Sequence, residues 1–132
     1  MLICTTDGGG TLAFPNVCNT PSPSGTVPIP YPSQGGYDDA DDYSDKVKIS
    51  NKYVCTTGCS IGSTSTDEAG TSGGVVSGSN SDEAAPIMGS LKVFAEGNPV
   101  VRFLDPVQSN GSSANSVGAC ISPSQTLVWA LG

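Results

Sequence analysis

Cysteines are the residues of this sequence with the clearest chemical potential. The 132-residue chain has no histidine and five cysteines, Cys4, Cys18, Cys55, Cys59 and Cys120. Four thiolates can complete the closed tetrahedral shell that structural zinc prefers. Because five is an odd number, disulfides within one chain cannot use every thiol. The sequence therefore indicates a thiolate metal site, with disulfides and buried free thiols as the alternatives.

Two of the cysteines are close together in the segment "CTTGC". Cys55 and Cys59 lie here at C-x-x-x-C spacing, on either side of a glycine turn. This spacing brings the two thiols close enough to share one metal ion. A disulfide between Cys4 and Cys120, which would tie the two ends of the chain, is the main competing arrangement.

Short strands are the elements expected to position these thiols. Twelve valines outnumber six leucines, which favours strands over helices, and 17 glycines with 10 prolines predict many turns. The length predicts one domain over residues 1–132. Leu, Ile, Val and Phe together make only 27 of the 132 residues, so the core must be thin. A small scaffold with a thin core usually needs an additional cross-link, and a structural metal ion can supply one.

Several segments have a recognisable composition. "FPNVCNTPSPSGTVPIPYP", residues 14–32, is proline-rich and is expected to be a stiff, ordered arm. Residues 33–45 are rich in aspartate and predict a solvated loop. The Ser, Thr and Gly content of residues 60–90 is typical of a flexible linker. "VKISNKYV" (47–54) and "VFAEGNPV" (93–100) form a weak repeat, and each predicts a strand, a tight turn and a strand.

The charge and the remaining motifs exclude several classes of function. The net charge is −7 and the five basic residues are not clustered, which argues against nucleic-acid binding. The sequence has no apolar run long enough to span a membrane and no signal-peptide pattern, so we expect a cytoplasmic origin. Asp67 and Glu68 are expected to accept backbone hydrogen bonds at a turn rather than to catalyse a reaction. Arg102 is expected to pair with a carboxylate or to cap carbonyls.

Four landmarks occur in a fixed order: "FPNVCNTPSPSGTVPIPYP", "KVKISNKYV", "STSTDEAGTSGGVVSG" and "KVFAEGNPVVRFLDP". In this order they resemble the PAAR-like domain family, which is often attached to the toxins of contractile injection systems. The resemblance covers roughly residues 11–115. It implies a small, cone-shaped all-β domain of short hairpins and long Pro/Gly-rich loops, tied together by a metal ion near its tip. The implied activity is binding and mechanics rather than catalysis.

The resemblance also bears on the metal ligands. Cys18 matches the cysteine of the family's proline-rich motif, and with Cys55, Cys59 and Cys120 it makes the expected ligand set for zinc. Many family members carry a histidine after the "DP" that matches Asp105 and Pro106, whereas this chain reads "DPVQSNGSSAN". The extra cysteines compensate for that loss, or the site is rearranged, or an iron or iron–sulfur centre or a disulfide replaces zinc.

The resemblance implies that the chain caps the trimeric β-helical spike of a type VI secretion system or phage-tail-like machine. One copy would sit on each spike, wait in the bacterial cytoplasm before firing and touch the target membrane only transiently. No effector domain is expected after Gly132. The alternatives are a small secreted effector and a disulfide-bonded extracellular binding module. The apolar tail is expected either to dock on the spike or to pack within the domain, through Leu127, Val128, Trp129 and Leu131.

Overall fold

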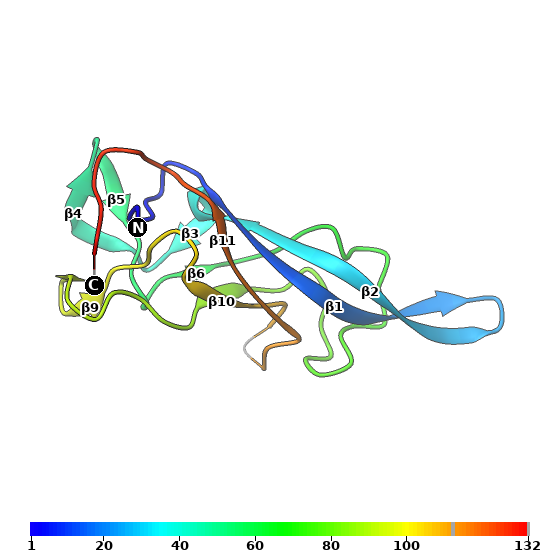
Figure 1. Ribbon diagram of the computed structural model, residues 1–132. Coiled ribbons are helices and arrows are strands. Elements are labelled where there is room, and N and C mark those ends of the chain that lie inside the picture. The colour runs from blue at the N-terminus through cyan, green and yellow to red at the C-terminus, as the bar shows by residue number, and fades with distance from the viewer. Residues whose placement is uncertain (112, 132) are drawn as a thin grey trace.

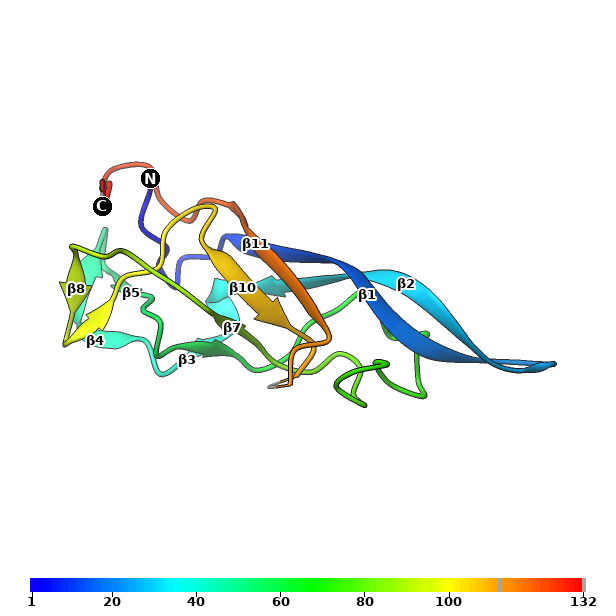
Figure 2. The ribbon, with the colours of Figure 1, turned by 60° about the horizontal axis from the view of Figure 1, so that its bottom comes forward.

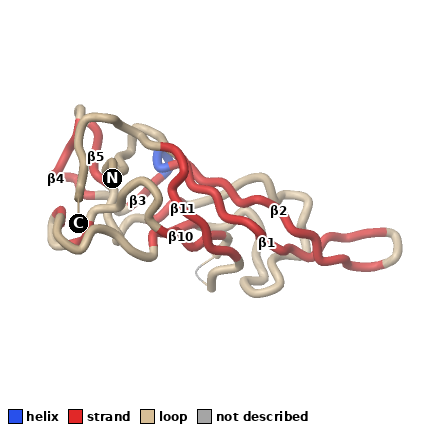
Figure 3. Tube along the Cα trace, in the orientation of Figure 1, coloured by secondary structure: helices blue, strands red, loops and turns tan. Residues whose placement is uncertain are grey.

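The fold consists almost entirely of β-strands and the loops that connect them, as Figure 3 shows. The computed structural model describes residues 1–111 and 113–131. Within these residues the only helical element is the short 3-10 helix η1 (Tyr37–Asp39), and no helix is long and apolar enough to cross a membrane. The all-β prediction is confirmed. The strands are β1 (Gly10–Ser22), β2 (Gly25–Gly36), β3 (Ala40–Asp41), β4 (Ser44–Ile49), β5 (Lys52–Val54), β6 (Ser60–Ile61), β7 (Ala84–Pro86), β8 (Phe94–Ala95), β9 (Asn98–Pro99), β10 (Pro106–Ser109) and β11 (Ser116–Ser122).

Seven strands form one sheet in the order β2-β1-β11-β10-β7-β6-β3. Two separate two-stranded hairpins, β4–β5 and β8–β9, complete the set. The molecule is elongated and tapers from a broad end to the tip of the β1–β2 hairpin (Figures 1 and 2). The broad end carries both small hairpins and both chain termini, so residues far apart in sequence meet there.

The proline-rich segment is an ordered hairpin arm rather than a linker, as expected. It fills most of β1 and β2, and β2 is an edge strand of the sheet. Pro28 and Pro30 of β2 lie opposite Asn19 and Val17 of β1. Proline has no N–H group to donate, so these prolines fit only where the backbone N–H would point away from the partner strand. The outer edge of β2 therefore offers fewer donors to a foreign strand.

The Ser/Gly-rich segment is ordered, although its composition is typical of a linker. The N–H of Asn19 in β1 donates to the carbonyl of Gly73 at 2.8 Å, and the N–H of Val75 donates to the carbonyl of Val17 at 3.0 Å. These contacts cover part of the free edge of β1. The linker-like composition of residues 60–90 was therefore misleading, because backbone pairing and the burial of Ile61 and Ala84 hold this segment.

The aspartate-rich segment is likewise more buried than expected. Tyr37 is fully buried, and Ser33, Ala40 and Ser44 are also buried. The prediction of a fully solvated loop over residues 33–45 is therefore wrong at these positions. The aspartates next to Tyr37 are exposed, so the segment buries one aromatic anchor while its charges face solvent.

A glycine allows β11 to approach β1 very closely. Gly118 pairs with Ala13 of β1, and a Cβ atom at Gly118 would lie 1.8 Å from the carbonyl oxygen of Leu12. No side chain fits in this space. Gly118 therefore fixes the β1–β11 contact that joins the hairpin arm to the rest of the sheet.

Candidate functional site

Four of the five thiols gather in one buried group, which we call the thiol cluster: Cys4, Cys55, Cys59 and Cys120. The Sγ atoms of Cys4 and Cys120 lie 3.3 Å apart. Cys55 and Cys59 lie on either side of the turn that follows β5, where each thiol shifts the pKa of the other. The structure thus arranges these thiols as two pairs, one local in sequence and one joining the two ends of the described chain.

Within each pair the two thiols shift each other's pKa in opposite directions. The hydrogen bond to Cys120 raises the pKa of Cys4, and burial raises it further. The hydrogen bond to Cys59 acts on the pKa of Cys55 in the same way. The same contacts lower the pKa of Cys120 and of Cys59. Cys4 and Cys55 therefore keep their protons at neutral pH.

Paired in this way, the thiols do not form a metal shell as they stand. In the part of the chain that the structure describes, no group of three or more Cys, Asp or Glu side chains is arranged to hold a metal ion. Four soft donors would suit zinc by their chemistry. Their geometry, however, is that of two pairs. Zinc bound by Cys18, Cys55, Cys59 and Cys120, and the iron–sulfur alternative, stay predictions.

The structure does not bring Cys18 into the thiol cluster. Cys18 lies within β1, opposite Ile29 of β2, and its Sγ atom donates to Oδ1 of Asn16 at 3.7 Å. Nδ2 of Asn110 donates to the same sulfur at 3.6 Å. Burial and the nearby Asp67 carboxylate raise the pKa of Cys18. Of the four predicted ligands, three therefore lie together, and Cys4 takes the place assigned to Cys18.

Cys18 belongs instead to a second buried group, which we call the amide cluster: Asn16, Cys18, Asp67 and Asn110. Nδ2 of Asn16 donates to Oδ2 of Asp67 at 2.8 Å, and Nδ2 of Asn110 donates to Oδ1 of Asn16 at 3.1 Å. All four residues are fully buried. Gly70 closes this group, because a Cβ atom there would lie 2.4 Å from Cβ of Cys18. The cluster ties the hairpin arm to two distant loops.

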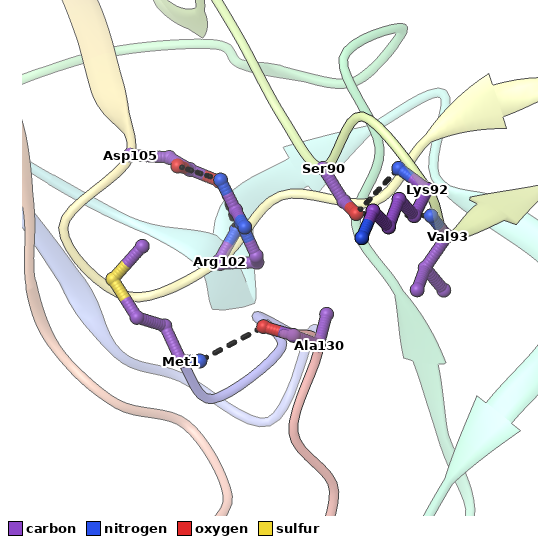
Figure 4. A network of polar contacts seen from close by, with 7 residues as sticks. All are labelled: Met1, Ser90, Lys92, Val93, Arg102, Asp105 and Ala130. Carbon is purple, nitrogen blue, oxygen red and sulfur yellow. Dashed lines mark hydrogen bonds and ion pairs between the residues drawn. The ribbon is translucent and has the colours of Figure 1, made fainter. Parts of the chain in front are cut away.

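An ion pair fixes the loop before β10. The Arg102 guanidinium donates to both carboxylate oxygens of Asp105, at 3.1 and 3.0 Å, and the Arg102 backbone N–H donates to Oδ2 at 2.7 Å (Figure 4). Both side chains are largely buried. In the same view, the Ser90 hydroxyl accepts the N–H groups of Lys92 and Val93. The expectation that Arg102 pairs with a carboxylate is confirmed.

Three segments meet around a common axis at the broad end: residues 2–6, 53–57 and 99–103. The N–H of Cys4 donates to the carbonyl of Val101, the N–H of Val101 donates to that of Cys55, and the N–H of Cys55 donates to that of Cys4. The three distances are 2.8, 3.0 and 3.0 Å. These bonds form a closed ring, which places the three residues at equivalent positions.

A second ring of backbone bonds repeats the pattern two residues away. Each N–H donor of the second ring lies two residues after Cys4, Cys55 or Val101, and each carbonyl acceptor lies two residues before one of these three. The bonds run from Thr6 to Tyr53, from Thr57 to Pro99 and from Phe103 to Leu2. Two concentric rings with the same offsets show that the three segments are related by an approximate threefold axis. We call this part of the fold the threefold base.

Each segment of the threefold base has an antiparallel partner strand. β4 pairs with β5 and β8 pairs with β9, through turns whose two central residues have positive φ, Ser50 and Asn51 in one and Glu96 and Gly97 in the other. Positive φ at both positions is typical of type I′ hairpins. The hairpins predicted at 47–54 and 93–100 are therefore confirmed.

The third pair is formed by the two ends of the chain. Leu2 pairs with Trp129, and the N–H of Ala130 donates to the carbonyl of Met1 at 2.8 Å. Figure 4 shows the reciprocal bond, from the amino group of Met1 to the carbonyl of Ala130. Residues 128–130 thus occupy the position that β4 and β8 occupy in the other two units.

One valine in each unit lies at an equivalent, partly open position. Val47, Val93 and Val128 are 38%, 36% and 39% exposed. They precede Ile49, Ala95 and Ala130 by two residues, and those three line the apolar core of the threefold base. Residues two apart on a strand share a face. The three valines therefore extend this apolar core to the protein surface, where solvent reaches it.

Comparison with known proteins identifies the family of this chain. A family profile described as the toxin PAAR-like domain matches residues 9–118. The chain belongs to the toxin PAAR-like domain family. No curated protein and no solved structure matches it. The resemblance read from the sequence, over roughly residues 11–115, is confirmed.

In this PAAR-like domain the family landmarks pack against one another. Asn16 and Cys18 come from the first landmark, Asp67 and Gly70 from the third, and Asn110 follows the "DP" of the fourth. Sequence reasoning missed the two asparagines, although Asn16 lies two residues before Cys18 and Asn110 lies within the stretch "DPVQSNGSSAN". Buried amides can link separate loops because each carries two donors and an acceptor.

The thiol pair Cys4 and Cys120 lies outside the matched residues of the PAAR-like domain. The family profile therefore does not account for this pair.

An open pocket beside β2 is lined by Gln34, Gly35, Gly36, Asp39, Ser63, Thr64 and Ser65. Asp39 is the only ionisable residue among them, so this lining offers no acid–base pair. The family is a structural, toxin-associated one.

Replacing Tyr37 by phenylalanine is expected to stabilise the domain by about 1 kcal/mol. Tyr37 is fully buried beside the thiol cluster, and its hydroxyl has no hydrogen-bond partner among the described residues. Tyr31→Phe is the matched control, because its hydroxyl lies 2.7 Å from Oγ1 of Thr20, and its loss should lower stability. Urea unfolding measures both changes. Equal losses of stability in the two variants would contradict the inference that the Tyr37 hydroxyl is buried without a partner.

Proposed function

We propose that this PAAR-like domain is the tip protein of a contractile injection system, such as a type VI secretion system, and that it caps a trimeric β-helical spike. The threefold base carries the proposal. A single chain can match a trimeric partner only if it presents three similar surfaces, because each subunit of the trimer offers the same one. Two rings of equivalent backbone bonds supply such surfaces.

The strands at the rim of the threefold base suit a β-structured partner. β4 pairs only with β5, and β8 only with β9, among the described strands, so each has an edge with unpaired backbone groups. Val47 lies in β4, Val93 directly precedes β8, and Val128 lies in the chain end that pairs with Met1 and Leu2. All three are partly exposed and leave the apolar core open. A trimeric β-helix could continue both features, by pairing with the edges and by covering the valines.

The apolar tail adds aromatic and aliphatic surface at the same end. Leu127, Trp129 and Leu131 are 73%, 61% and 88% exposed. Phe94, at the position in β8 that corresponds to Trp129, is 56% exposed. Exposed aromatic residues near an apolar patch are typical of interface anchors. We therefore propose that Leu127, Val128, Trp129 and Leu131 contact the spike, together with Phe94.

The narrow end suits the leading part of a spike. The β1–β2 hairpin forms the tip of the taper (Figure 2), and residues 8–37 contain no charged side chain. Charged groups are costly to move through the apolar layer of a membrane, so an uncharged leading arm meets less resistance. Assembly in the bacterial cytoplasm, delivery on firing and brief contact with a target membrane belong to the same proposal.

Mixing the domain with a purified trimeric spike protein tests the docking directly. We expect one chain per trimer, measured by light scattering after size exclusion. Val93→Asp should weaken binding at least about tenfold, because a charge would replace an apolar contact at one of the three positions. Val128→Asp should act in the same way.

Val76→Asp is the matched control for these variants. Val76 is 66% exposed and lies in the Ser/Gly-rich segment, outside the threefold base. Its replacement should leave binding unchanged. Circular dichroism of each variant separates loss of docking from loss of fold. Folded Val93→Asp and Val128→Asp proteins that bind as tightly as the wild type would count against docking through the threefold base.

A further inference from the structure

The thiols of Cys4 and Cys120 connect two parts of the fold that are built separately. Cys4 belongs to the first ring of the threefold base, where its N–H and its carbonyl are both hydrogen-bonded. Cys120 lies in β11, in the large sheet, opposite Thr11 of β1. A covalent link between them would tie residues 2–6, one third of the threefold base, to the sheet that carries the hairpin arm.

The geometry of this pair is close to that of a covalent bond. The two Sγ atoms are 3.3 Å apart, and both residues are no more than 1% exposed. Sulfur atoms in a disulfide lie about 2.05 Å apart, so an approach of little more than about 1 Å would bond them. The other close pair, Cys55 and Cys59, closes only a short loop, and Cys18 is held in the amide cluster.

We propose that Cys4 and Cys120 are a redox site that closes to a disulfide when the domain meets a small-molecule disulfide such as oxidised glutathione. The thiols stay reduced in a reducing cytoplasm and pair in an oxidising environment. Nothing in this reaction needs a spike partner, so it can be tested apart from docking.

The exchange is balanced with that oxidant. The Cys120 thiol loses its proton to water, and its sulfur attacks one sulfur of the small disulfide, which releases one thiolate and leaves a mixed disulfide on Cys120. Cys4 then loses its proton, and its sulfur attacks Sγ of Cys120, which releases the second thiolate. Two protein thiols are oxidised, and one small disulfide is reduced to two thiols. Because both cysteines are buried, local opening of residues 1–6 sets the rate.

The bond is expected to stabilise the folded domain. It would close a loop that contains nearly the whole chain, and long loops lose the most unfolded-state entropy when they are cross-linked. A rise in melting temperature of about 10 °C is expected for a chain of this size. The gain should appear only in the oxidised protein and should vanish with dithiothreitol.

Thiol counting and peptide mapping test the proposal on the full chain. The reduced protein is incubated with oxidised glutathione, quenched with iodoacetamide and digested for mass spectrometry. We expect the number of free thiols to fall from five to three, with a cross-linked peptide that contains Cys4 and Cys120. Cys18→Ser should form the same cross-link and fall from four thiols to two. Cys120→Ser should not form it.

Three outcomes would overturn the proposal. Five free thiols after prolonged oxidation of folded protein would mean that the pair does not react. A cross-link that joins Cys55 and Cys59 alone would assign the redox site to the other pair. One zinc ion per chain in elemental analysis, with four thiols protected until chelation, would show a metal shell in place of the disulfide. The wild-type measurements decide among these outcomes even if Cys120→Ser does not fold.

Discussion

Replacing Arg102 by methionine is expected to lower the free energy of unfolding by about 3–5 kcal/mol. The Arg102 guanidinium is the cation that faces the Asp105 carboxylate, and the side chain of Asp105 is only 4% exposed. Methionine fills similar space but leaves this carboxylate buried without its partner. An unpaired buried charge costs far more than an ordinary surface contact contributes. Urea unfolding followed by circular dichroism gives the change.

Two further variants show whether the loss comes from the stranded charge. Lys52→Met removes the cation of an exposed pair, in which Nζ lies 3.9 Å from Asp7 and both side chains are 51% exposed. That change should cost less than about 0.5 kcal/mol. Adding Asp105→Leu to Arg102→Met should recover part of the loss, because no charge is then left buried. If the double variant were no more stable than Arg102→Met alone, the stranded carboxylate would not be the cause.

The strand content and two of the three base units could be predicted from the sequence. The repeat of "VKISNKYV" and "VFAEGNPV" places Asn51 and Gly97 at equivalent turn positions, and both have positive φ in the structure. Such turns have a local sequence signature, because few residues adopt this backbone conformation easily. Local signals of this kind are readable without knowledge of the fold.

The third unit of the threefold base could not be read as a repeat. Residues 1–3 and 128–130 form it together, so no contiguous stretch carries its pattern. Its residues also differ from those of the other units: Trp129 stands where Phe94 and Lys48 stand. The equivalence of the three units depends on their backbone hydrogen bonds. These bonds constrain the path of the chain more strongly than they constrain the type of side chain at each position. Only the assembled rings reveal it.

The grouping of the cysteines was predictable only in part. Cys55 and Cys59 are four residues apart across a turn, so their contact follows from spacing. The sequence raised the pairing of Cys4 with Cys120 only as an alternative, because their contact depends on where β11 lies beside the threefold base and no local signal gives that. Cys18 matches a family motif, yet the register of β1 places it against Asn16 and Asn110. The family motif therefore identified Cys18 but did not predict which side chains surround it.

Asp67→Ala is expected to lower the free energy of unfolding by about 2–4 kcal/mol. The Asp67 carboxylate is fully buried and accepts hydrogen bonds from Nδ2 of Asn16 at 2.8 Å and from Oγ of Ser81 at 2.9 Å. It also accepts the backbone N–H of Ser81. Alanine would leave these donors buried without partners, and each such group costs about 1–3 kcal/mol before the structure relaxes.

Glu68→Ala is a control from the adjacent position. Glu68 is exposed, and its replacement should change the free energy of unfolding by no more than about 0.5 kcal/mol. A large loss for Asp67→Ala with none for Glu68→Ala would show that the "TDEAG" landmark serves to hold loops on the hairpin arm. Comparable small losses in both would instead mean that Asn16 and Ser81 find other partners. Because Asn16 also binds Asn110, the loss at Asp67 should spread through the amide cluster and raise the exchange rate of amide hydrogens in β1 near Cys18.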